Sequence, residues 1–310
     1  MLYKARKIHA GVALITALLV VALATITAVA MLNQQQLEIR RTINVLNYDQ
    51  ATLYALGGET WAKRILLRDL QYSKIDSLQE LWAIPLPATV VVGGSIQGQI
   101  QDLQRYFNLN NVIKEGRVSS EDVAFFERLL ITLDLSPHLS QALIDWIDSD
   151  IELELPDGAE DDIYLLRKPA YRAANRPLQS PSELRLIAGF DQEIYLKLLP
   201  YITALPTYTA LNINTASTVL LMALIEELSQ TEAERLVADR DKQPFEEIQD
   251  FLQHDSLSGL ILQPISLTIS SDYFICTTQA EITHVQLQLN SILYRSDQKI
   301  TVIMRSQNTL

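Results

Sequence analysis

The sequence predicts an α+β protein in which one long N-terminal helix precedes an antiparallel sheet and a large all-α domain is inserted into the sheet sequence. Three observations predict this class. An uncharged apolar run at 11–32 continues as a helical pattern to about Leu70. Apolar and polar residues alternate, as is typical of strands, at 88–104 and again at 263–310. Helix-start signals recur between these tracts, at 113–262.

Composition limits the classes of function. The 310 residues carry a formal net charge of −12, which disfavours nucleic acid as a partner because phosphate binding needs clustered Lys and Arg. One cysteine, Cys276, and four histidines leave no room for a Cys/His zinc site. The single cysteine also excludes an intramolecular disulfide.

The N-terminal apolar run is long enough to cross a membrane, since about 20 apolar residues suffice. Basic residues precede it, which favours a cytoplasmic N-terminus and an exported body; they are Lys4, Arg6 and Lys7. Three fates are open. The run is a signal peptide cleaved after the small residue Ala30, or an uncleaved anchor, or a segment cut at its start between Gly11 and Val12.

The third fate fits the details best. A basic leader (1–11) that ends in Gly11 directly before Val12 resembles the signal of type IV prepilins, which a prepilin peptidase cuts on the cytoplasmic side of the membrane. Removal of three cations with the leader shifts the net charge from −12 to −15. Prepilins carry Glu at the fifth mature position, where this chain has Thr16. That Glu is thought to pair with a neighbouring subunit's amine, so Thr16 indicates a subunit at a filament tip. The alternative is a small polar residue tolerated in a membrane helix.

The remaining elements follow in chain order. The helix is predicted to run to about Leu70, with a bend or tight packing at Gly57-Gly58 because each glycine costs about 1 kcal/mol against alanine. Residues 88–104 predict strand. The C-terminal tract predicts an antiparallel meander that begins with the alternating residues 265–269 and turns at 296–298.

Four sites in the helical block carry helix-start signals. They are Ser119-Ser120, Ser136-Pro137, the capping-box pattern 180–183, and 214–216 before an apolar helix. The stretch 211–252 resembles a helix-hairpin-helix module, whose DNA-binding members use a Gly-hydrophobic-Gly hairpin to reach phosphate. Here that position holds Glu226-Glu227, and an earlier hairpin pairs Gly189 with Asp191. Both hairpins are therefore interpreted as packing units.

An acidic tract at 145–164 is the one candidate metal site. Ca²⁺ takes six to eight oxygen ligands, and Asp148-x-Asp150 with a turn at Gly158 supplies several. The alternative is a solvated acidic loop. Catalysis by paired carboxylates lacks a nearby nucleophile. The following Arg172, Asn175 and Arg176 are expected to pin this loop rather than to bind an anion.

Taken together, the chain resembles the minor pseudopilin K family of the type II secretion system over nearly its full length. The resemblance rests on the motifs GVALITALLVV, YALGGETWAK, GSIQGQIQDLQRYFNLNN, DWIDSD…GAEDDIYL…YRAANRPLQSPSELRLIAG and LNINTAS. It implies a pilin-like fold, with a transmembrane helix packed on an antiparallel sheet and an inserted domain of helix-hairpin-helix or SAM-like units. The implied boundaries are leader 1–11, membrane helix 12–32, pilin-like 33–112, helical insert 113–262 and C-terminal strands 263–310.

The resemblance also implies a mechanical role, without catalysis. The subunit would cap or initiate a periplasmic pseudopilus, anchored by one pass in the bacterial inner membrane. Its partners would be minor pseudopilins I and J, through them H and the major pseudopilin, and the prepilin peptidase. The family binds Ca²⁺ in the inserted domain, and the candidate ligands here are Asp148, Asp150, Glu160, Asp161 and Asp162. Two alternatives remain, a DNA-binding helix-hairpin-helix protein and a periplasmic metal-dependent hydrolase.

Overall fold

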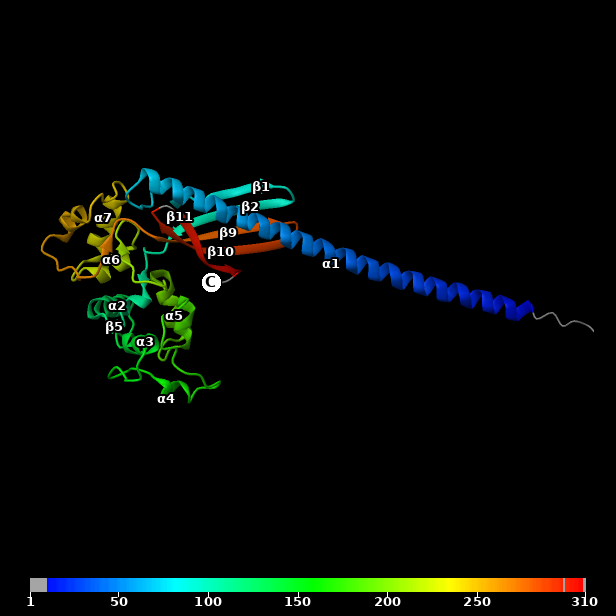
Figure 1. Ribbon diagram of the computed structural model, residues 1–310, viewed down its shortest axis with the longest axis horizontal. Coiled ribbons are helices and arrows are strands. Elements are labelled where there is room, and N and C mark those ends of the chain that lie inside the picture. The colour runs from blue at the N-terminus through cyan, green and yellow to red at the C-terminus, as the bar shows by residue number, and fades with distance from the viewer. Residues whose placement is uncertain (1–9, 298, 309–310) are drawn as a thin grey trace, which may run out of the picture.

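One helix, α1 (Ala10–Tyr72), dominates the molecule. In this computed structural model, which describes residues 10–297 and 299–308, α1 has 63 residues and is therefore about 95 Å long. Its first half projects away from the body, and its second half lies across a sheet (Figure 1). The prediction of a helix to about Leu70 is confirmed.

Five antiparallel strands form the sheet, in the order β1-β2-β9-β10-β11. Their bounds are β1 (Leu86–Val91), β2 (Gly94–Asp102), β9 (Tyr273–Ile282), β10 (Val285–Ser296) and β11 (Lys299–Gln307). The predicted strand tract at 88–104 is confirmed, and so is the C-terminal tract from Tyr273 onward. Ser296 pairs with Lys299 at the β10–β11 hairpin, and Gln298 of the predicted turn lies outside the described residues. The central pair β2–β9 brings together segments on either side of the helical block.

The second half of α1 packs closely on one face of the sheet. Ala51 and Ala55 are fully buried against β9 and β10, and Ala62 and Leu66 are buried further along the helix. A Cβ at Gly58 would lie 2.6 Å from Thr278 Cγ2, closer than real side chains approach. Of the two alternatives predicted for the glycine pair, the structure shows tight packing, since Gly58 lets the sheet approach closely and α1 continues through it as one helix.

The residues between β2 and β9 form a mainly helical unit beyond the end of the sheet (Figure 1). Its helices are α2 (Ser120–Thr132), α3 (Leu139–Ile147), α4 (Asp161–Tyr164), α5 (Gln192–Leu198), α6 (Thr218–Leu224), α7 (Gln230–Arg240) and α8 (Ile248–Leu252). Short 3-10 segments are η2 (Leu109–Val112), η3 (Pro181–Leu186), η4 (Leu199–Tyr201) and η5 (Asp255–Leu257), and η1 (Leu81–Ala83) precedes β1. Two-residue strands pair as β3 (Phe107–Asn108) with β6 (Ile202–Thr203), β4 (Ile113–Lys114) with β5 (Arg117–Val118), and β7 (Leu211–Asn212) with β8 (Leu267–Thr268).

Some local predictions in this unit are confirmed and others are wrong. Ser119 caps α2 as expected, since its side chain accepts from Asp122 N. The helix expected after 214–216 is confirmed as α6, and Ser217 is the residue whose side chain caps it. The pattern at 180–183 starts only a 3-10 turn, and Glu183 Oε1 accepts from Gln179 N instead of closing a capping box.

The expected strand at 265–269 does not join the meander. Its central residues form β8, which pairs in parallel with β7. Ile265, Leu267 and Ile269 pack against the core of the helical unit. Alternation described the strand geometry correctly but did not identify the pairing partner.

Candidate functional site

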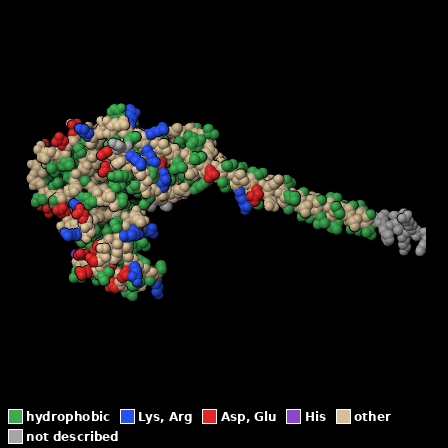
Figure 2. Space-filling view, viewed as in Figure 1, with side chains coloured by type: hydrophobic (Ala, Val, Ile, Leu, Met, Phe, Trp, Pro, Cys, Tyr) green, Lys and Arg blue, Asp and Glu red, His purple; other side chains and the backbone are tan. Residues whose placement is uncertain are grey.

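Among the described residues, none packs over the membrane-length segment of α1. Its apolar side chains are exposed, with Leu14 at 63% and Ile15 at 67%, and this helix is the one candidate span among the described residues (Figure 2). Thr16 Oγ1 donates to Ala13 O at 3.0 Å, so its hydroxyl is satisfied within the helix. Gly11 and Val12 lie in the first turns of α1. Residues 1–9, with Lys4, Arg6 and Lys7, lie outside the described residues.

Asp145 organises the acidic loop from beneath. It sits in α3 with its side chain fully buried. Its Oδ1 accepts from Glu154 N at 3.1 Å and its Oδ2 from Ala159 N at 2.6 Å, which folds residues 148–160 back over the helix end. A Cβ at Gly158 would lie 2.3 Å from Asp145 Oδ2, so this turn requires glycine. Sequence reasoning missed this role of Asp145, for which a lone Asp inside the apolar helix ALIDWI was the available signal.

Three predicted ligands converge above Asp145. One carboxylate oxygen from each of Asp148, Asp150 and Glu160 lies within 4.8 Å of the other two. Glu160 is 5% exposed, and neither of its oxygens has a hydrogen-bond partner. Asp148 Oδ1 is also buried without a partner. Buried acceptors are normally satisfied, so these atoms indicate a ligand.

Asn175, which was not predicted as a ligand, is hydrogen-bonded to one member of this cluster. Its Oδ1 is buried and unpartnered, while its Nδ2 donates to Asp150 O at 2.9 Å. The residue adopts a positive φ of 44°, which Asn tolerates better than most residues. Asn175 was expected to pin the acidic loop, and it does so through Nδ2, while its buried Oδ1 is left without a partner.

The charges of the cluster repel one another. Burial and then the neighbouring Asp145 and Asp148 raise the pKa of Glu160 to about 7. Burial and then Asp150 raise the pKa of Asp148 to about 6. A hard divalent cation bound by oxygen atoms would relieve both the repulsion and the unmet hydrogen bonding, so these residues fit Ca²⁺.

The other two predicted ligands are not among these three clustered carboxylates. Asp161 Oδ1 accepts from Ala173 N at 3.0 Å, and its Oδ2 pairs with Arg172 at 3.5 Å. Asp162 is exposed, and its Oδ1 accepts from Ile163 N. Both begin the short helix α4, where carboxylates interact favourably with free backbone N–H groups.

The helix-hairpin-helix positions are engaged within the fold. Glu226 N donates to Ile261 O, so this hairpin amide already has a protein acceptor. Glu227 takes a positive φ of 61° where DNA-binding members use glycine. This geometry matches the interpretation of these hairpins as packing units.

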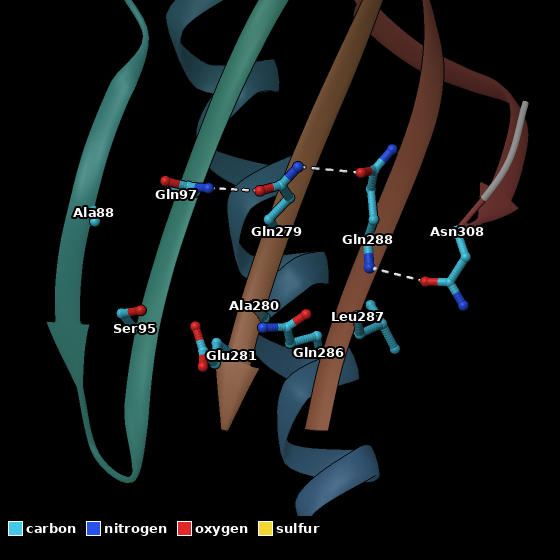
Figure 3. Close-up of a pocket in the computed structure, with 10 residues that line it drawn as sticks. All are labelled: Ala88, Ser95, Gln97, Gln279, Ala280, Glu281, Gln286, Leu287, Gln288 and Asn308. Carbon is cyan, nitrogen blue, oxygen red and sulfur yellow. Dashed lines mark hydrogen bonds between the residues drawn. The ribbon is translucent and has the colours of Figure 1, made fainter. Parts of the chain in front are cut away.

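A broad hollow on the open face of the sheet is lined mainly by uncharged side chains, among which glutamines are the commonest (Figure 3). Gln97 Nε2 donates to Gln279 Oε1, and Gln279 Nε2 donates to Gln288 Oε1 at 3.1 Å, forming an amide row across β2, β9 and β10. Glu281 is the one charged side chain among the ten lining residues. No serine–histidine or carboxylate pair that could run a hydrolysis occurs among these ten.

A long helix with a free apolar half, packed by its other half on an antiparallel sheet, defines a pilin-like, membrane-anchored protein. Comparison with known proteins narrows this class. Models of the family "Type II secretion system (T2SS), protein K" match residues 105–207 and 211–270. Type II secretion system protein K of Pseudomonas aeruginosa is 39% identical over 307 residues, which cover 95% of this chain and 92% of the relative. The Klebsiella pneumoniae protein is 35% identical over 311 residues, 95% of each chain.

The fold is also similar to a solved structure. It matches a chain in the crystal structure of the GspK-GspI-GspJ complex from the enterotoxigenic Escherichia coli Type 2 Secretion System with a TM-score of 0.79 and 27% identity. The match covers 87% of this chain and 100% of that chain. The chain therefore belongs to the type II secretion system protein K family, and it is a minor pseudopilin.

Proposed function

We propose that this minor pseudopilin assembles with minor pseudopilins I and J into a complex at the tip of a periplasmic pseudopilus, which it caps or initiates. The observation that carries the proposal is the division of α1 into a free apolar half and a half packed on the sheet. A free apolar helix serves both as an anchor and as a surface for neighbouring subunits. The solved relative is itself part of a GspK-GspI-GspJ complex.

Thr16 supports a position at the tip. A subunit with another subunit above it would use a carboxylate at this position to meet the neighbour's amine. The Thr16 hydroxyl is instead satisfied within its own helix. A subunit at the tip needs no such contact, because no subunit lies above it. The pseudopilin H and the major pseudopilin would then follow below I and J.

The proposed topology is a single pass through the bacterial inner membrane with the C-terminal body in the periplasm. The basic residues before the apolar run support a cytoplasmic start. We further propose that a prepilin peptidase cuts between Gly11 and Val12, which leaves α1 intact from Val12 onward.

The acidic cluster is proposed to hold Ca²⁺. The residues that would bind it are Asp148, Asp150, Glu160 and Asn175. The ion would supply positive charge that neutralises the buried carboxylates. The residues themselves would then hold the loop 148–160 against Asn175 and α3. This role is structural, since metal-coupled folding needs no reaction at the site.

Co-assembly tests the proposed function. We expect the full chain, expressed with I and J, to purify as one complex with both. Leu53 on α1 is 69% exposed, and Leu53→Lys should abolish that complex because an ammonium would be placed in an apolar helix contact. Val90→Lys is the matched control, since Val90 is 87% exposed on edge strand β1. Thr16→Glu should leave the complex intact. Failure of the wild-type chain to bind I and J would overturn the proposal.

A further inference from the structure

A second acidic cluster lies at the C-terminal end of α1, where the helix, the sheet and the helical unit meet. This junction cluster consists of Asp69, Asp76, Glu80 and Arg295. Asp69 lies in the last turns of α1, Asp76 and Glu80 in the loop that follows, and Arg295 near the end of β10. One carboxylate oxygen from each of the three acids lies within 4.8 Å of the other two.

Arg295 neutralises only part of this cluster. Its guanidinium donates to Asp69 Oδ2 at 3.0 Å, to Asp76 Oδ2 and to Ser271 O, and it lies 4.7 Å from the centre of the Phe274 ring. Three carboxylates thus share one guanidinium. Asp102, 1% exposed, adds a further carboxyl group behind Asp76, linked to it through Asn212, whose Nδ2 donates to both Asp76 O and Asp102 Oδ2. Buried charges without partners are costly, so the excess negative charge needs compensation.

Asp76 leaves one buried oxygen without a partner, and hydrogen bonds hold Glu80 beside it. Asp76 is 1% exposed, and its Oδ1 has no hydrogen-bond partner, although its Oδ2 accepts from two donors, Ser271 N and the Arg295 guanidinium. Glu80 Oε2 accepts from Ser77 N at 2.9 Å and from Trp82 Nε1 at 2.8 Å, which fixes the carboxylate in place. Burial and then Glu80 raise the pKa of Asp69 to about 6, in keeping with excess negative charge.

We infer that Asp69, Asp76 and Glu80 form a second binding site for a hard divalent cation such as Ca²⁺, beside the Arg295 guanidinium. The chemistry suits such an ion, since Ca²⁺ binds carboxylate oxygens at about 2.3–2.6 Å and accepts water at its remaining positions. Three carboxylate oxygens within 4.8 Å of one another are close enough to share one such ion. Asp69 is 11% exposed and Glu80 half-buried, which leaves a path for the ion from solvent.

Calorimetric titration of the full chain with Ca²⁺ in detergent micelles tests the site. The Glu160→Gln variant is used first, because it removes the cluster around Asp148. We expect this variant still to bind Ca²⁺. Adding Glu80→Gln should weaken that binding by about tenfold or more, since a charged ligand is lost while the acceptor for Trp82 and Ser77 remains. Adding Glu193→Gln instead is the control, because Glu193 is an exposed carboxylate on α5 and should change nothing.

Luminescent Tb³⁺ locates the bound ion independently. Trp82 contacts Glu80, so indole excitation should produce Tb³⁺ emission in the Glu160→Gln chain. Trp82→Phe should remove most of this emission, and Trp146→Phe should preserve it, because Trp146 lies in α3. Trp82→Phe should retain Ca²⁺ binding by calorimetry, which shows that the variant is folded.

Two results would overturn the inference. The first is a Glu160→Gln chain that binds no Ca²⁺ at millimolar concentration, in which case protons neutralise the junction cluster. The second is residual binding that Glu80→Gln does not weaken. Both results would leave the proposed site at Asp148, Asp150 and Glu160 standing, because that site is judged by the Ca²⁺ bound to the wild-type chain and lost with Glu160→Gln.

Discussion

Glu59 of α1 forms a two-pronged ion pair with Arg305 of β11, with Arg305 Nε 2.6 Å from Glu59 Oε2 and a terminal nitrogen 3.0 Å from Glu59 Oε1. Lys63 lies 2.8 Å from the same carboxylate, and Ser291 Oγ donates to it at 2.8 Å. Glu59 is only 3% exposed. The buried carboxylate of Glu59 therefore holds α1 on the edge strand β11, in addition to the apolar contacts between the helix and the sheet.

Replacing Glu59 with Gln should destabilise the body of the protein. The amide cannot balance Arg305 and Lys63, so we expect a loss of about 2 kcal/mol in the free energy of unfolding. Glu38→Gln is the control, since Glu38 pairs with Arg41 at an exposed position on α1 and should change stability by less than about 0.5 kcal/mol. Chemical unfolding of the full chain in detergent gives both values. Equal effects of the two substitutions would contradict this assignment.

The same carboxylate predicts a pH dependence. Burial acts to raise the pKa of Glu59, but hydrogen bonds from Arg305, Lys63 and Ser291 outweigh it and lower the pKa from 4.5 to about 2. A lowered pKa in the folded state means that this stabilisation is complete above about pH 4.5 and is lost as the pH falls toward 2. The stability difference between wild type and Glu59→Gln should therefore shrink over this interval. A difference that stays constant would show that Glu59 does not titrate in this way.

The two adjacent glycines of α1 should respond differently to alanine. A Cβ at Gly58 collides with Thr278, so Gly58→Ala should cost about 1–3 kcal/mol. Nothing lies within 4 Å of a Cβ at Gly57, so Gly57→Ala should be neutral or stabilise the chain by up to about 1 kcal/mol. Thermal unfolding of the two variants measures this contrast. A reversed order would contradict the observed packing, in which Gly58, and not Gly57, faces Thr278.

Chelation should lower the melting temperature. A ligand that binds only the folded state at about 100 times its Kd contributes about 2.7 kcal/mol, which chelation removes. Glu160→Gln should lose the part of the response that comes from the Asp148 cluster and keep only the part that comes from the junction cluster. Asp162→Asn should keep the full response, because Asp162 lies outside the Asp148 cluster. Loss of the response in Asp162→Asn would move the proposed site to the start of α4.

The sequence was most informative where a pattern reflects local geometry. The apolar run and its helical continuation predicted α1, and alternation in the two outer tracts predicted the strands of one sheet. Ser119 was recognised as a cap because hydroxyl capping is a local interaction. The capping-box signal at 180–183 failed because Glu183 accepts from Gln179 N, and only a 3-10 segment follows Ser180.

Long-range relations could not be predicted in the same way. The pairing of β8 with β7 depends on the core of the helical unit, and nothing within 265–269 specifies it. The candidate cation site was predicted from the density of acids, the turn at Gly158 and the family resemblance, and these named Asp161 and Asp162 together with the three clustered acids. Asn175 was assigned to loop contacts, because its approach to Asp150 depends on how the chain returns after α4.

The mature N-terminus of the protein, read by intact mass from its native membrane with and without the prepilin peptidase, tests the central claim most directly. A pilin-type subunit should begin at Val12, and only when the peptidase is present. A start after Ala30 would mean a released protein and would contradict the account, as would an intact Met1 in cells that contain the peptidase.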